Sequence, residues 1–162
     1  MNISIVYTSQ TGNTKDVAYI LRDCFEQQGH QVYLVNVKYE QINEQAIEKS
    51  DLVLFGTYTW GNGELPIDMR NILRYILKEK NISLPATAVF GTGEMMWTYY
   101  CRAVDEIAYH LSKYTNVLGT LKIEQSPVGL QEEKVKKFAD YIVGMVDLHG
   151  NSIEESKIVR TV

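Results

Sequence analysis

Residues 2–14 of the chain read NISIVYTSQTGNT and join a short apolar run directly to an amphipathic segment. Apolar and polar side chains alternate through residues 2–8, which predicts a β-strand. Apolar residues then recur at helical spacing through residues 13–29, and Gly29 is a typical helix stop. A strand that passes into a helix over a few polar residues is typical of the first half of a β-α-β unit.

The same alternation of strands and helices continues along the chain. Further strands are expected at residues 31–37, 51–56, 86–92 and 117–123. Further helices are expected at residues 40–49, 67–80, 99–114 and 131–147. The run DLVLFG at residues 51–56 is typical of a central parallel strand that is buried on both faces. The pattern predicts the α/β class: a doubly wound, five-stranded parallel sheet in the order 2-1-3-4-5, with helices on both faces.

Length and composition favour one ordinary globular domain. The 162 residues are expected to divide into a domain at residues 1–147 and a C-terminal extension at residues 148–162. A net charge of −4 disfavours nucleic acid as a partner. No apolar run approaches the roughly 20 residues that span a bilayer, and the N-terminus lacks signal-peptide features. We expect a cytoplasmic monomer with free thiols at Cys24 and Cys101 and with no bound metal.

The segment between the first strand and the first helix is a candidate anion site. Its candidate binding residues are Ser9, Gln10, Thr11, Gly12, Asn13 and Thr14. Unpaired backbone N–H groups at a helix start attract anions, and hydroxyl side chains can add donors. The lysine of a P-loop is missing, so the segment does not match that motif. The alternative interpretation is an ordinary N-cap loop with redundant hydroxyl groups.

Two further loops, each carrying a tryptophan, follow the third and fourth strands. The candidate residues after the third strand are Thr57, Tyr58, Thr59, Trp60, Gly61, Asn62 and Gly63. The candidate residues after the fourth strand are Thr92, Gly93, Glu94, Trp97, Tyr99, Tyr100 and Cys101. In a doubly wound sheet these loops flank the cleft at the switch point of the strand order. Either indole could pack back onto the domain, but together they indicate a planar ligand.

These three segments resemble the cofactor loops of the flavodoxin family, specifically of its short-chain group. The resemblance covers residues 2 to about 147, and no long insertion interrupts the fifth strand. It implies one non-covalently bound FMN, with the rings of Trp60 and Trp97 against the two flavin faces. It also implies that the phosphate is bound by Ser9, Thr11, Asn13 and Thr14.

The resemblance assigns roles on the flavin ring as well. The backbone groups of Glu94, Tyr99 and Cys101 would bond the pyrimidine edge of the ring. The Gly61 carbonyl would turn toward the flavin N5 after one-electron reduction. Two residues depart from the family pattern: Trp97 stands where a tyrosine is usual, and Asn62 stands where an aspartate is common.

The function that the resemblance implies is low-potential single-electron transfer between a reductase and acceptor redox enzymes. A donor of the ferredoxin/flavodoxin–NADP reductase type and reductive enzymes as acceptors would be the protein partners. The chain would then be a carrier and not a stand-alone catalyst. Two alternatives stay open on the same fold: an NAD(P)H-dependent flavin or quinone reductase, and a flavoprotein that activates a ribonucleotide reductase. A signalling receiver domain would need an acidic cluster where this sequence has Thr, Ser and Trp.

Overall fold

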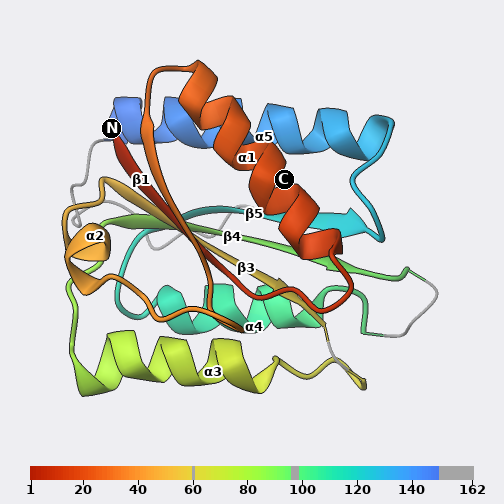
Figure 1. The fold of residues 1–162 in the computed structure, drawn as a ribbon, viewed down its shortest axis with the longest axis horizontal. Coiled ribbons are helices and arrows are strands. Elements are labelled where there is room, and N and C mark those ends of the chain that lie inside the picture. Colours follow the sequence, from red (N-terminus) through yellow and green to blue (C-terminus); the bar gives the residue numbers. More distant parts are fainter. Residues whose placement is uncertain (60, 96–98, 150–162) are drawn as a thin grey trace.

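The computed structural model describes residues 1–59, 61–95 and 99–149, and its centre is a parallel β-sheet (Figure 1). The five strands pair in the order β2-β1-β3-β4-β5. They are β1 (Asn2–Tyr7), β2 (Gln31–Asn36), β3 (Leu52–Tyr58), β4 (Ala86–Gly93) and β5 (Val117–Glu124). The predicted fold class and strand order are therefore confirmed.

Helices cover both faces of the sheet, as Figure 1 shows. Helices α1 (Asn13–Gln27) and α5 (Leu130–His149) pack on one face. The other face carries α2 (Glu44–Glu48), α3 (Ile67–Arg74), a π-helical turn η1 (Tyr75–Glu79) and α4 (Arg102–Leu111). Each face has its own apolar core, so the sheet separates two hydrophobic layers.

Strand β3 contributes side chains to both cores. Leu52 and Leu54 belong to the core under α1 and α5, whereas Val53 and Phe55 belong to the core under α3 and α4. All four side chains are 0% exposed. Full burial of such a side chain is worth about 1.5–3 kcal/mol. The prediction of a central strand that is buried on both faces is confirmed.

Two helices begin later than the sequence pattern predicts. The helix expected at residues 99–114 begins at Arg102, because Cys101 adopts a left-handed conformation with φ of 50°. The helix expected at residues 40–49 begins at Glu44. Here the side chain of Asn43 caps the helix by accepting a hydrogen bond of 3.2 Å from the backbone N–H of Ala46.

Two other helices differ at their C-terminal ends. The segment expected as one helix at residues 67–80 is α-helical only to Arg74 and continues as η1. In η1 the N–H of Lys80 bonds the carbonyl of Tyr75, one residue further back than in an α-helix. Helix α5 extends through His149, so the first residues of the expected extension are helical. The rest of that extension lies outside the described residues.

Two features of the described residues bear on partners. None of their helices has both the length and the apolar character that crossing a membrane requires. Among the same residues, no group of three His, Cys, Asp or Glu side chains is placed to hold a metal ion.

Gly56 on β3 provides a test of the packing, because a Cβ there would lie 2.1 Å from an atom of the Phe90 ring. We expect Gly56→Ala to lower the free energy of unfolding by about 1–3 kcal/mol through overpacking. The matched control is Gly144→Ala in α5, where an added Cβ meets nothing within 4 Å. This change should raise the stability by roughly 0.5–1 kcal/mol because alanine favours a helix. Urea unfolding of both variants measures the difference, and equal effects of the two changes would contradict the packing described here.

Candidate cofactor-binding site

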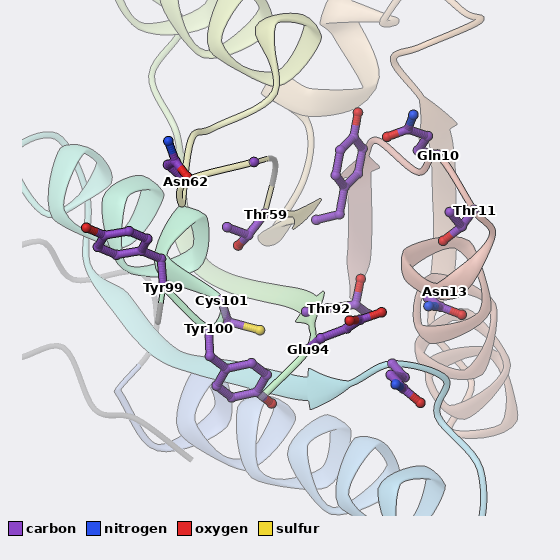
Figure 2. A pocket seen from close by; sticks show the side chains of 14 residues that line it. Gln10, Thr11, Asn13, Thr59, Asn62, Thr92, Glu94, Tyr99, Tyr100 and Cys101 are labelled. Carbon is purple, nitrogen blue, oxygen red and sulfur yellow. The ribbon is translucent and has the colours of Figure 1, made fainter. Parts of the chain in front are cut away.

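The loops that follow β1, β3 and β4 meet at the carboxyl edge of the sheet and enclose a pocket of about 400 Å³. Figure 2 shows Gln10, Thr11 and Asn13 on one side of this pocket and Tyr99, Tyr100 and Cys101 on the other. The remaining lining residues are Tyr58, Thr59, Gly61, Asn62, Thr92, Gly93, Glu94 and Gln125. The volume is in the range of small-molecule sites, which is about 300–1,000 Å³.

One side of the pocket is formed by the start of α1. Gly12 precedes the helix with φ of 100°, a conformation that favours glycine. The backbone N–H groups of Asn13 and Thr14 have no hydrogen-bond acceptor among the described residues. These N–H groups carry the positive end of the helix dipole. This end of the pocket can therefore bind an anion with neutral donors.

Several predicted binding residues support the pocket from behind its lining. Ser9 is buried, and its Oγ accepts a hydrogen bond of 3.2 Å from the backbone N–H of Lys15. Thr14 and Thr92 share a buried hydroxyl–hydroxyl hydrogen bond of 2.8 Å. The Thr57 hydroxyl donates to the backbone carbonyl of Tyr58. Ser9, Thr14 and Thr57 are therefore positioned to hold the loops, and their hydroxyls already have partners within the protein.

The loops after β3 and β4 are packed against each other. The Thr59 hydroxyl accepts a hydrogen bond of 3.3 Å from the backbone N–H of Ala103 in the first turn of α4. A Cβ at Gly63 would lie 2.6 Å from the Cβ of Tyr99 and 2.9 Å from Arg102. Gly63 also has φ of 95°, so glycine is required there for two reasons. Gly63 lies outside the pocket lining and sets how closely the two loops approach.

Negative charge reaches the pocket from its surroundings. The Thr8 hydroxyl donates a 2.6 Å hydrogen bond to Asp68 at the start of α3. Burial raises the pKa of the Tyr58 phenol, and the nearby Asp68 carboxylate raises it further. The negative charge of Asp68 therefore acts on Tyr58, a side chain of the pocket wall. The described lining contains the carboxylate of Glu94 and no Lys, Arg or His.

Cys101 lies in the wall with its side chain fully buried. Burial raises the pKa of its thiol to about 11, although the Tyr100 hydroxyl and Lys122 oppose this shift. Burial also raises the pKa of the neighbouring Tyr100 phenol. Both groups stay protonated at neutral pH. The wall is therefore neutral here and offers no thiolate nucleophile.

The pocket gathers residues that are far apart in the sequence, and all the described lining residues except Gln125 were predicted. Gln125 follows β5 with φ of 53°, and its backbone N–H donates a 2.8 Å hydrogen bond to the Gly93 carbonyl. No local sequence pattern distinguishes it, although its place just after a strand was a usable signal. Ser9, Gly12, Thr14, Thr57 and Gly63 lie behind or beside the lining. Trp60 and Trp97 lie outside the described residues.

A parallel sheet of this order with an anion site and a glycine-rich loop at its carboxyl edge defines a nucleotide-binding α/β protein. The flavodoxin family model matches residues 5–138, which is most of the chain. The chain therefore belongs to the flavodoxin family. Strand β5 is continuous from Val117 to Glu124, as expected for the short-chain group.

Individual relatives agree with this assignment. The flavodoxin of Nitratidesulfovibrio vulgaris (strain Miyazaki F) is 35% identical over 136 residues, which cover 82% of this chain and 90% of that protein. Probable flavodoxin 2 of Bacillus subtilis (strain 168) is 32% identical over 142 residues, which cover 84% and 90%. The crystal structure of oxidised flavodoxin 2 from Bacillus cereus has a TM-score of 0.79 at 29% identity and covers 90% of this chain and 99% of that chain. FMN, the cofactor that flavodoxins bind, is therefore the cofactor of this chain.

The described residues fit FMN. The unpaired N–H groups of Asn13 and Thr14 match the needs of a phosphate. Gly61 lines the pocket with φ of 48°, and a Cβ placed on it would meet nothing within 4 Å, so its backbone faces open space. The neutral wall at Tyr100 and Cys101 suits an uncharged ring system.

The buried thiol of Cys101 allows the burial of the pocket wall to be tested in solution. In a Cys24→Ser variant, we expect iodoacetamide to label Cys101 slowly in the folded protein. A pKa of about 11 instead of 9 lowers the thiolate fraction at pH 8 by about a hundredfold, and burial slows the reaction further. Mass spectrometry at increasing pH should show labelling rise until about pH 11. The urea-unfolded variant is the control, and equal labelling rates in the folded and unfolded states would contradict the buried wall.

Proposed function

We propose that this chain is a low-potential single-electron carrier that shuttles electrons between a reductase and acceptor redox enzymes. The observation that carries the proposal is the pocket at the carboxyl edge of the sheet, which combines a neutral anion site with a lining free of cationic side chains in the described residues. Membership of a family of electron carriers supports it. The described lining also lacks a Ser-His-Asp or Cys-His arrangement for nucleophilic catalysis.

The proposed binding residues divide between the two ends of the pocket. Thr11 would donate its hydroxyl to the phosphate, and the N–H groups of Asn13 and Thr14 would complete that site. At the other end, backbone groups of Tyr99 and Cys101 would bond the ring edge. When bound, FMN supplies one-electron oxidation and reduction at the ring edge. The proposed stacking residues are Trp60 and Trp97, as the family resemblance implies.

The charges around the pocket support a low potential. Glu94 lies in the lining, and Asp68 raises the pKa of Tyr58, another lining residue. Glu124 contributes to the raised pKa of Tyr100. These carboxylates oppose the arrival of further negative charge in the pocket by Coulomb repulsion. The described lining holds no cationic side chain that would attract that charge.

Thr11→Val tests the phosphate end of the site. A hydrogen bond to a charged group contributes about 1.5–3 kcal/mol, so FMN affinity should fall roughly 10- to 100-fold. Affinity for riboflavin, which lacks the phosphate, should be unchanged, and Thr11→Ser should restore FMN binding. Titration of the apoprotein while following the quenching of flavin fluorescence gives the affinities. Equal losses for FMN and riboflavin would show that Thr11 acts on the fold and not on the phosphate.

A second experiment separates a carrier from a reductase. The FMN-loaded protein alone should oxidise NADPH at no more than the rate of free FMN, because a carrier depends on a separate reductase. Addition of a ferredoxin/flavodoxin–NADP reductase together with NADPH should produce rapid loss of the oxidised flavin absorbance under anaerobic conditions. Fast NADPH oxidation by the protein alone would identify it instead as an NAD(P)H-dependent flavin or quinone reductase.

A further inference from the structure

A groove lies between α4 and the helical segment formed by α3 and η1, outside the cofactor pocket. It has a volume of about 330 Å³. Figure 1 shows α3 and α4 next to each other on the face of the sheet opposite α1 and α5. The apolar part of this groove consists of the buried side chains of Leu65, Leu73 and Leu77. The ring of Tyr114, 48% exposed, adds an accessible aromatic surface.

Cationic side chains line both walls of this groove. Arg70, Arg74 and Lys78 follow one another at intervals of four residues, so they lie along one side of α3 and η1. Lys113 lies on the opposite wall, beyond the end of α4. All four residues are exposed, and Glu106 is the one carboxylate in the lining as described. The local charge is therefore positive on a chain whose net charge is −4.

Three of these four cations lack partners within the described structure, whereas the Nζ of Lys113 lies 4.5 Å from the centroid of the Tyr109 ring. The side chains of Arg70, Arg74 and Lys78 make no ion pair or hydrogen bond with any described residue. Two lysines elsewhere do form ion pairs: Lys122 with Asp105 at 2.8 Å and Lys136 with Glu132 at 3.2 Å. Like charges four residues apart destabilise a helix, so this arrangement does not serve the stability of α3. It leaves cationic charge available to a carboxylate from outside the chain.

The groove is continuous with the rim of the cofactor pocket. A shallow hollow between them shares Arg70 and Glu106 with the groove and Asn62 with the cofactor pocket. Its other charged residues are Arg102, Glu64 and Asp105, so this hollow carries both signs of charge and the positive charge is concentrated in the groove. A protein that covers the groove would therefore extend toward the pocket opening.

We propose that this groove is a docking surface for an acidic face of a redox partner protein, an inference that rests on the proposed carrier function. Exposed cations around an apolar floor have the composition of a protein interface, with an apolar centre and a charged rim. The positive patch on an acidic chain also orients an approaching acidic partner before contact.

The distribution of the charges favours a protein surface over a small anion. From Arg70 to Lys78 the cations extend over eight residues, or about 12 Å of helix axis. One phosphate reaches only part of that length. None of the four cations is buried, whereas a site built for a single anion surrounds it with enclosed donors.

The test uses two forms of one redox protein as probes: native cytochrome c, which is basic, and the same protein with its lysines succinylated, which is acidic. Calorimetry with the FMN-loaded protein should show that the acidic form binds at low ionic strength and weakens as salt is added. The double variant Arg74→Glu/Lys78→Glu should lose about tenfold or more of the affinity for succinylated cytochrome c. The same variant should bind native cytochrome c more tightly than the chain without substitutions does.

The matched control is Lys49→Glu/Lys137→Glu, which changes the net charge equally at exposed residues outside the groove. It should retain most of the affinity for the acidic probe. Equal losses of affinity for the acidic probe in both double variants would show that only the net charge of the chain matters, and would overturn the proposal. FMN uptake and circular dichroism show whether each variant is folded.

The remaining outcomes separate this inference from the carrier function and from other occupants. Electron transfer from the reduced protein to the acidic probe at equal rates in all variants would leave the carrier function intact and overturn the docking surface. Failure to take up FMN would refute the carrier function, while apoprotein calorimetry would still test the groove.

Displacement of the probe by inorganic phosphate, but not by sodium chloride of equal ionic strength, would identify a small-anion site instead. A dimer that the groove variant dissociates would identify a second copy as the occupant. Either result overturns the proposal.

Discussion

Strand β3 carries apolar side chains on both faces, and neither face is accessible to water. The strand lies at the middle of the order β2-β1-β3-β4-β5, so helices must cover the sheet on both sides. Polar chemistry then has to lie at the edge of the sheet where the strands end. The loops after β1, β3 and β4 end there together, and the position of the cofactor pocket follows from the burial of this one strand.

The cofactor pocket and the groove between α3 and α4 differ in charge for a physical reason. The cofactor pocket binds its anion through backbone N–H groups at the start of α1, so its described lining requires no cationic side chain. Carboxylates can then surround the pocket without forming ion pairs inside it. The cations Arg70, Arg74 and Lys78 lie instead along α3 and η1, where they are exposed to molecules outside the protein.

Much of the fold and most of the described pocket could be predicted from the sequence, because apolar periodicity and strand ends are local signals. The start of α4 was not predictable in this way. The helical pattern extends back to Tyr99, but Cys101 adopts a left-handed conformation and packs, buried, against Gly93 at the end of β4. Gln125 was missed because its role depends on a bond to the Gly93 carbonyl across the sheet. Such tertiary contacts leave no periodic trace in the sequence.

The hydroxyl pair between Thr14 and Thr92 has a consequence for the thermodynamics of the whole chain. It ties the first turn of α1 to the end of β4 through a bond that is shielded from solvent. The two segments can separate only when that bond breaks and leaves two buried hydroxyls without partners. A nucleotide that binds across both segments requires them to stay together, so its binding increases the free energy of unfolding with the logarithm of its concentration relative to the dissociation constant.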